Sequence, residues 1–127
     1  MAFDRRAVGR AFSEHRFEEA VGHLARDVRW TIVGYMVLEG ADAVRRTCRE
    51  TLESLADTTT TYDRCVVAAG PDNVAVDTFA RYSGPAGLTA VASCDFYEFS
   101  GDEITAITSY AVEVDPDSAG AQPPRSP

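Results

Sequence analysis

Residues 88–114 read LTAVASCDFYEFSGDEITAITSYAVEV, and this stretch sets the architecture of the chain. Apolar and polar residues alternate on both sides of Ser100-Gly101-Asp102, as they do in β-strands with one buried face. Because so short a turn joins antiparallel neighbours, we expect strands over 88–99 and 104–114 to form a hairpin.

The preceding sequence extends this hairpin to a larger sheet. Segments 58–68 and 74–82 show the same alternation, and with the hairpin they predict a four-stranded antiparallel meander. Residues 42–55 instead repeat apolar side chains every three or four positions, which is typical of a helix packed on one side. The remaining predicted elements are helices over 3–14 and 17–24, a strand over 28–33 and a short strand or extension over 35–38.

The order of these elements predicts an α+β fold. A curved antiparallel sheet would wrap around the long helix, with the two N-terminal helices beside it, and form a cone-shaped α+β barrel. With 127 residues the chain fits a single domain, for which we expect residues 1–115. Proline, serine, glycine and alanine are frequent in residues 116–127, which predicts a disordered tail.

The charge balance excludes several classes of function. Twenty acidic residues outnumber twelve basic ones, all of them arginine, so the net charge is −8. The absence of lysine excludes Schiff-base and P-loop chemistry, and an acidic chain is a poor partner for nucleic acid or an anionic membrane. Three cysteines and two histidines without metal-ligand spacing indicate no metal site and free thiols. Because no apolar run has the length of a signal peptide or membrane span, we expect a soluble, cytoplasmic protein.

Three stretches resemble the nuclear transport factor 2-like superfamily. Residues 24–34 (LARDVRWTIVG) resemble its junction between helix and first strand, residues 38–44 (LEGADAV) the glycine and helix start that follow, and residues 99–104 (FSGDEI), with Tyr110, its last hairpin. The chain is most similar to the SnoaL-like group, which includes polyketide cyclases and is related to ketosteroid isomerase and limonene epoxide hydrolase. The resemblance implies a small-molecule pocket between the concave sheet face and the helices, and we expect no cofactor.

Asp95 is the first candidate catalytic residue. The run from Cys94 to Phe99 (CDFYEF) resembles the ketosteroid isomerase strand whose aspartic acid stays protonated in an oxyanion hole. Apolar neighbours would raise the pKa of the Asp95 carboxyl. Tyr97 lies two residues further on the same strand face and is another candidate catalytic residue. The alternative is an aspartate that faces solvent or pairs with a cation.

A second carboxylate, Asp77, interrupts the strand over 74–82, where strand propensity disfavours aspartate. The resemblance places Asp77, Asp95 and Ser109 inward, so that the two carboxyl groups could act as base and acid. The alternative is an exposed Asp77 in a surface charge pair.

Residues on neighbouring elements could line the same pocket. The side chains that we expect to contact substrate are Trp30, Phe79, Arg81, Ser109, Tyr110 and Tyr35. Core packing, or an exposed loop for Tyr35, is the competing interpretation.

We expect His15, at the break between the first two predicted helices, to be a capping or surface residue rather than a base. Both faces of the strand over 88–99 carry apolar residues, so we expect a homodimer that covers the second sheet face.

Two functions remain open at this point. One is a cofactor-independent acid–base enzyme of the cyclase, isomerase or dehydratase type that acts on a small apolar or polyketide-like molecule. The other is a non-catalytic dimeric module that binds a small molecule or a protein in the same cone. The match to ketosteroid isomerase is incomplete, since its helix-one tyrosine falls near Val8 and its catalytic aspartate near Thr31 or Ile32.

Overall fold

The computed structural model describes residues 3–117. The helical elements are α1 (Arg5–Ser13), the two 3-10 turns η1 (Phe17–Glu19) and η2 (Val21–His23), and α2 (Ala41–Ser54). The strands are β1 (Leu24–Ile32), β2 (Met36–Glu39), β3 (Thr59–Ala69), β4 (Asn73–Gly84), β5 (Gly87–Ser100) and β6 (Glu103–Val114). The predicted tail begins at residue 116, and residues 118–127 lie outside the described part of the chain.

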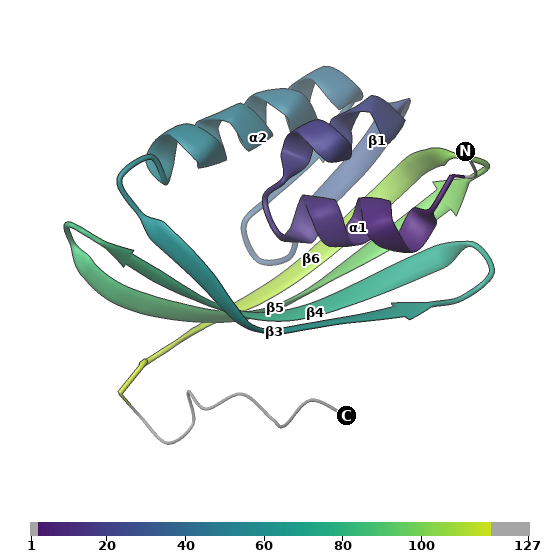
Figure 1. The fold of residues 1–127 in the computed structure, drawn as a ribbon. Helices are drawn as coiled ribbons and strands as arrows, with labels where there is room; N and C mark the ends of the chain where they lie inside the picture. Colours follow the sequence, from purple (N-terminus) through teal and green to yellow (C-terminus); the bar gives the residue numbers. More distant parts are fainter. Residues whose placement is uncertain (1–2, 118–127) are drawn as a thin grey trace.

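The strands form one curved sheet in the order β2-β1-β6-β5-β4-β3, with α1 and α2 on its concave side (Figure 1). The predicted α+β class and the antiparallel meander from β3 to β6 are confirmed. The sheet is nevertheless mixed, because β1 pairs with β6 in parallel while β2 pairs with β1 antiparallel. This parallel contact joins the N-terminal elements to the end of the meander and closes one side of the cone.

The predicted helix over 17–24 is wrong. The chain there forms η1 and η2, each three residues long, and β1 already begins at Leu24. Phe17, Ala20 and Leu24 are buried, so their helical spacing reflects contact with the core rather than a continuous helix. A segment this short that contains Gly22 cannot offset the cost of helix nucleation.

Helix α1 is fixed at its start by a side-chain cap and along its length by close packing. Asp4 accepts hydrogen bonds from the backbone N–H groups of Arg6 and Ala7 at 3.0 and 3.2 Å, the usual role of an N-cap aspartate. Gly9 lies where the helix touches the sheet: a β-carbon there would come within 3.1 Å of a Val74 methyl group and 3.2 Å of the Tyr97 ring.

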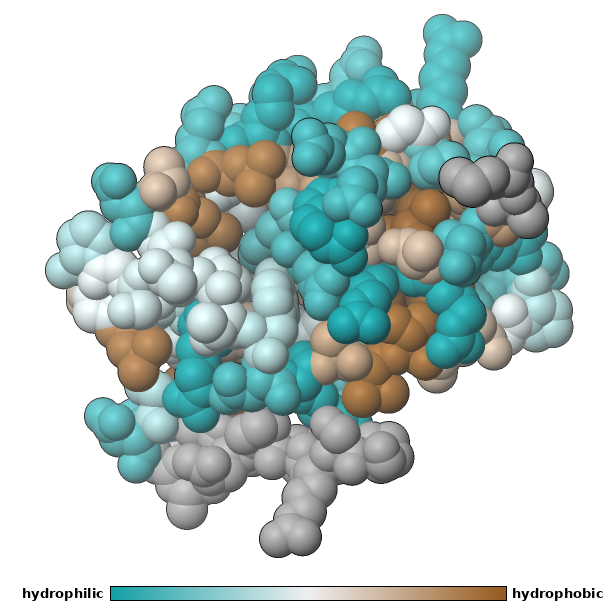
Figure 2. Space-filling view, in the orientation of Figure 1, coloured by the Kyte–Doolittle hydropathy of each residue, from teal (hydrophilic) through white to brown (hydrophobic). Residues whose placement is uncertain are grey.

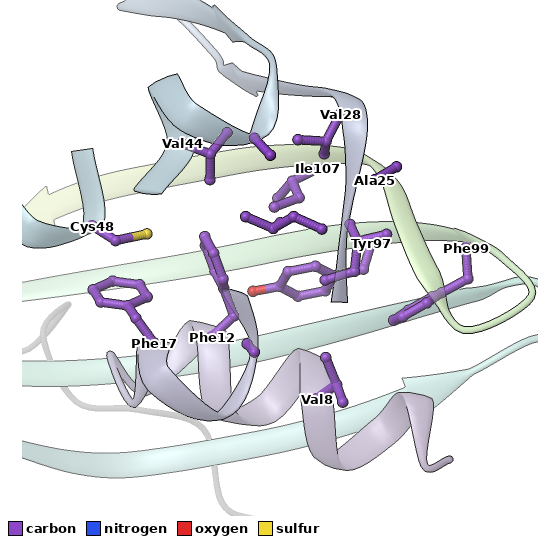
Figure 3. Packing of buried hydrophobic residues seen from close by; sticks show 14 of the residues in the cluster. Val8, Phe12, Phe17, Ala25, Val28, Val44, Cys48, Tyr97, Phe99 and Ile107 are labelled. Carbon is purple, nitrogen blue, oxygen red and sulfur yellow. The ribbon is translucent and has the colours of Figure 1, made fainter. Parts of the chain in front are cut away.

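The core lies between α1, α2 and the concave sheet face (Figure 3). Tyr97 lies along the sheet in this cluster, with its hydroxyl directed toward the Phe12 ring. Helix α2 packs mainly on β1 and β2, and its predicted apolar stripe is buried only in its first part, through Ala41, Val44 and Cys48. Leu52, which continues that stripe, is 48% exposed. The C-terminal end of α2 therefore overhangs a space above the sheet instead of filling it.

Hydrophilic residues cover most of the face drawn in Figure 2, and hydrophobic residues show there in small separate patches. Among residues 3–117, no helix is long and apolar enough to cross a membrane.

The contact at Gly9 can be tested with two alanine substitutions. Gly9→Ala should destabilise the fold by about 1 kcal/mol, because overpacking costs about 1–3 kcal/mol and exceeds the gain of about 0.5–1 kcal/mol in helix propensity. Gly22→Ala is the matched control, since a β-carbon there meets nothing within 4 Å, and it should be neutral or slightly stabilising. Urea unfolding of the two variants measures the difference, and equal stabilities would contradict the tight contact.

Candidate functional site

A cavity of about 270 Å³ lies between the C-terminal end of α1, helix α2 and the concave face of the sheet. It adjoins a wider outer cavity of about 620 Å³ between the end of α2 and the β4–β5 turn. Both cavities are lined by His15, Thr51, Tyr82 and Val91, which form the neck between them. A concave, partly enclosed space lined by apolar and hydroxyl groups is the usual form of a small-molecule site.

Asp95 lies at the wall of the inner cavity, in the middle of β5. The hydroxyl of Ser13, the last residue of α1, donates a hydrogen bond to Oδ2 of Asp95 at 2.7 Å. Ser109 on the neighbouring strand β6, which pairs directly with Asp95, is its second hydrogen-bond partner. The carboxyl group keeps a little surface toward the cavity, and protein atoms surround it elsewhere.

Two further donors support these serines. Trp30 Nε1 donates to the hydroxyl of Ser109 at 2.9 Å, and the Tyr97 hydroxyl lies 2.6 Å from the hydroxyl of Ser13. Since the Ser13 proton goes to Asp95, the Tyr97 proton is free to go to Ser13. Two short hydrogen-bond chains thus end at the Asp95 carboxyl group. One runs from Tyr97 through Ser13, and the other from Trp30 through Ser109.

Desolvation is the largest influence on the pKa of the Asp95 carboxyl group. Burial raises the pKa of Asp95 above its ordinary value, and hydrogen bonds from Ser109 and Ser13 together with the charge of His15 oppose the rise only in part. Burial also raises the pKa of Tyr97 well above its ordinary value, with the nearby carboxylate adding to the effect. Tyr97 therefore remains a hydrogen-bond donor, and Asp95 is held closer to its neutral form than an exposed aspartate.

His15 lies at the end of α1, as the predicted capping role expects, but its ring is only partly exposed to solvent. Its ring lines both cavities and lies 5.4 Å from the Phe17 ring and 6.3 Å from the Tyr82 ring, centroid to centroid. Burial lowers the pKa of His15, and the negative charge of Asp95 opposes that shift. The ring is therefore held in its neutral form at the neck of the cavity.

Tyr62 on β3 adds an unused donor to the cavity wall. Its hydroxyl is buried and has no hydrogen-bond partner in the structure, although a buried tyrosine hydroxyl normally finds one. Burial raises the pKa of this phenol, so it stays protonated. An unpartnered donor in a ligand-sized cavity favours an occupant that carries a hydrogen-bond acceptor.

The expectation that Asp77 shares the pocket with Asp95 is wrong. Asp77 pairs with Cys94 in the β4–β5 register, whereas Asp95 pairs with Val76. Directly paired residues point to the same side of a sheet and successive residues to opposite sides, so Asp77 lies on the convex face. There it accepts a hydrogen bond from Nε of Arg64 at 3.0 Å, as the alternative interpretation of a charge pair expected.

Phe79 and Arg81 share that convex face, because they follow Asp77 at intervals of two. Phe79 is buried against Ala90 in a small cluster of its own. Arg81 Nε donates to Oδ2 of Asp63 at 2.6 Å, and its guanidinium lies 5.4 Å from the centre of the Phe79 ring. Neither side chain lines the inner or the outer cavity, so the expectation that they contact substrate there is wrong.

Tyr110 and Tyr35 also lie away from the cavity. Tyr110 pairs with Cys94 on the convex face and is 53% exposed. Tyr35 lies in the turn between β1 and β2 and is 79% exposed, as expected of a loop aromatic. Of the predicted site residues, the structure brings together Asp95, Tyr97, Trp30 and Ser109.

Sequence reasoning missed the groups that complete this site from other elements. They are Phe12, Ser13, Thr47, Thr51, Tyr62, Thr78, Tyr82 and Ser93. Ser13 carried a usable signal, since a serine on the buried face of an amphipathic helix needs a partner. Within residues 3–117, no group of three or more histidine, cysteine, aspartate or glutamate side chains is placed to hold a metal ion.

The burial of Asp95 predicts how stability depends on pH. Because its pKa is raised in the folded state, its contribution to stability is fully present below the ordinary value of 3.8 and is lost as the pH rises through the raised value. Asp95→Asn should therefore increase the unfolding free energy at pH 7, by about 1.4 kcal/mol for each unit by which the pKa is raised, and the gain should vanish near pH 3.5. Urea unfolding at both pH values measures this.

The matched control is Asp77→Asn, which removes a carboxylate from a half-exposed ion pair. Such a pair contributes about 0–1 kcal/mol, so this variant should be neutral or slightly destabilised at pH 7. An Asp95→Asn variant that is no more stable than the wild type at pH 7 would contradict the desolvated state of Asp95.

Comparisons with known proteins agree with this architecture. The sequence model of the SnoaL-like domain matches residues 5–107. No protein of curated function gives a significant match to the sequence. Among solved structures, an NTF2-like protein of unknown function from Cytophaga hutchinsonii is 26% identical, with a TM-score of 0.73 over 84% of this chain and 94% of that chain.

More distant structures share the fold. A protein from Xanthomonas campestris, provisionally named a polyketide cyclase, is 16% identical, with a TM-score of 0.65 over 86% of this chain and 92% of that chain. An LEH-like epoxide hydrolase of M. tuberculosis is 17% identical, with a TM-score of 0.58 over 80% of this chain and 74% of that chain. The family match runs from α1 into the first part of β6, and the chain therefore belongs to the SnoaL-like domain family and has an NTF2-like fold.

Proposed function

We propose that the protein is a cofactor-independent acid–base enzyme that acts on a small apolar or polyketide-like carbonyl compound in the inner cavity. The observation that carries this proposal is the buried carboxyl group of Asp95 at the cavity wall, surrounded by hydroxyl donors. Carboxyl groups are rarely kept in such surroundings unless they work there, since burial without a cationic partner is costly.

The arrangement suits the stabilisation of negative charge on a carbonyl oxygen. A neutral Asp95 can donate its proton toward that oxygen, and Ser13 and Tyr97 hold the carboxyl group in place. Removal of a proton from the neighbouring carbon would then give an enol or enolate, the common intermediate of cyclisation, isomerisation and dehydration next to a carbonyl. Donors fixed in a water-poor site before the reaction stabilise developing charge more than water does.

The composition of the cavity supports the substrate class. Aromatic side chains from three elements, Phe12, Phe17 and Trp30, line it together with hydroxyl groups from α2 and the sheet. The unpartnered Tyr62 hydroxyl favours an acceptor oxygen on the ligand. Structural neighbours named as an epoxide hydrolase, an isomerase and polyketide cyclases support proton-transfer chemistry in general terms.

We also propose a homodimer through the convex sheet face and a cytoplasmic location. The convex face carries exposed apolar side chains on β6, Tyr110 and Val112, beside the buried cluster of Phe79 and Ala90. Such a patch favours a protein partner, and a second copy is its commonest form. The three unpaired cysteines support a reducing compartment.

The enzyme proposal is tested by hydrogen–deuterium exchange at the carbon next to a ketone. Cyclohexanone, 1-indanone and 2-tetralone are incubated with the protein in D₂O and followed by proton NMR. We expect the protein to accelerate exchange of at least one of them over buffer, and Asp95→Ala to lose about 10²–10³ of that acceleration, the usual cost of removing one oxyanion donor. Asp77→Ala, on the other sheet face, should keep the wild-type rate. No acceleration with any of the three ketones would contradict the proposal.

The dimer is tested by sedimentation velocity on two glutamate variants. Val112→Glu places a charge on the convex face and should convert the dimer to a monomer. Val37→Glu, an exposed valine on β2, should leave the sedimentation coefficient unchanged. A wild-type protein that sediments as a monomer would overturn this proposal.

A further inference from the structure

We propose that His15 is the catalytic base of this cavity and takes the proton from the carbon next to the carbonyl group that Asp95 binds. This inference rests on the proposed function and supplies the base that Asp77 cannot provide. It is argued from the backbone at His15, from the position of its ring and from the groups around it.

The backbone at His15 is held in an unfavourable conformation. Its φ angle is 63°, and among the non-glycine residues that the structure describes it alone has a positive φ. The N–H of Arg16 binds the carbonyl of Ala11 at 2.8 Å, and the N–H of His15 binds that of Phe12 at 3.1 Å. This pair of bonds is a Schellman motif that ends α1, with His15 at the position where glycine is usual. A histidine there indicates a role for the ring, because glycine would close the helix with less strain.

The same turn carries the ring into the cavity neck. Ser13, two residues earlier, reaches Asp95 from the same helix end, so α1 presents both groups to one chamber. The Phe17 ring is a tilted neighbour of the imidazole, the Tyr82 ring a stacked one, and the Tyr62 ring lies nearly perpendicular to it with centroids 6.5 Å apart. These three rings fix the imidazole, and the ring lines the inner and the outer cavity. A ligand in the inner cavity therefore lies in the same chamber as the imidazole.

The surrounding groups favour a neutral imidazole. Titratable neighbours are Asp95 on β5, Tyr62 on β3 and Tyr82 on β4, while Glu53 and Asp57 line the outer cavity with His15. Burial is the largest influence on both His15 and Asp95, and it disfavours the charged form of each. Burial therefore favours the neutral imidazole of His15 together with the protonated, neutral carboxyl group of Asp95.

The proposed step is a balanced proton transfer. The free imidazole nitrogen of His15 takes a proton from the carbon next to the carbonyl, and the electron pair of that C–H bond forms the new C=C bond. The π electrons of the C=O bond move to oxygen, which takes the proton of the Asp95 carboxyl group. Imidazolium, carboxylate and enol result. His15 then returns a proton to the original or a conjugated carbon while the enol O–H returns its proton to the Asp95 carboxylate, which re-forms the carbonyl group and gives exchange or isomerisation without a redox partner.

One test needs no substrate. Imidazole NMR signals are titrated in the wild type and in Asp95→Asn, with His23, which packs on Phe3, as the internal control. We expect His15 to titrate below its ordinary pKa of 6.5, because burial is the largest influence on it, and to stay low in Asp95→Asn, where no negative charge can oppose that effect. His23 signals should not respond to this substitution. A His15 that titrates above its ordinary pKa in the wild type would overturn the inference, because a protonated imidazole cannot act as the base.

The second test measures exchange of the ketone that the wild type turns over. His15→Asn, whose side chain tolerates the left-handed backbone, should lose at least about 10²-fold in rate and lose the rising limb of the pH profile. His15→Gly should regain rate when free imidazole is added, which a structural role would not allow. His23→Asn should behave as the wild type.

The outcomes separate the two proposals. A wild type that accelerates exchange, an impaired Asp95→Ala and an unimpaired His15→Asn would keep the proposed function and overturn the role of His15. A His15→Gly variant that folds, as shown by its circular dichroism spectrum, but gains nothing from imidazole would also overturn it. No exchange by the wild type contradicts the proposed function, while the imidazole titration still reports whether His15 and Asp95 are coupled.

Discussion

The hydroxyl of Ser13 joins the two halves of this molecule at one point. It binds Asp95 and lies within hydrogen-bond distance of Tyr97, and so connects the end of α1 to the middle of β5. Gly9 lets the same helix approach the sheet closely enough for that contact to form. The cavity exists because α1 is held against the sheet on one side while α2 overhangs it on the other. A carboxyl group that would destabilise an ordinary core is tolerated there because several hydroxyl donors surround it.

Departures from the usual rules of folding gather around this cavity. A carboxyl group is buried without a cation in contact, a histidine occupies a glycine position at a helix end, and a tyrosine hydroxyl lacks a partner. Elsewhere the described core follows the ordinary pattern of apolar side chains from α1, α2 and the concave sheet face. Unfavourable features of this kind persist where function requires them, and here three of them lie in a single chamber.

The sheet separates two surfaces with different properties. Alternation along β4 and β5 sends Asp95 and Tyr97 to the concave side and Asp77 and Phe79 to the convex side. The concave surface is partly open to the cavity and rich in hydroxyl groups, while the convex surface carries ion pairs and exposed apolar side chains. The same sheet thus carries the proposed acid–base site on one face and the proposed interface with a second copy on the other.

The sequence alone determined the order of helices and strands, the four-stranded meander and the shared face of Asp95 and Tyr97, because periodicity is a local property of the chain. It could not assign the concave side, since both faces of β5 carry apolar residues, and the family resemblance, used to choose that side, placed Asp77 wrongly. The parallel pairing of β1 with β6, the bond from Trp30 to Ser109 and the meeting of Ser13, His15, Tyr62 and Asp95 in one cavity were decided only by the tertiary structure. These contacts join residues that are distant in sequence, and their geometry depends on how the helices close over the curved sheet.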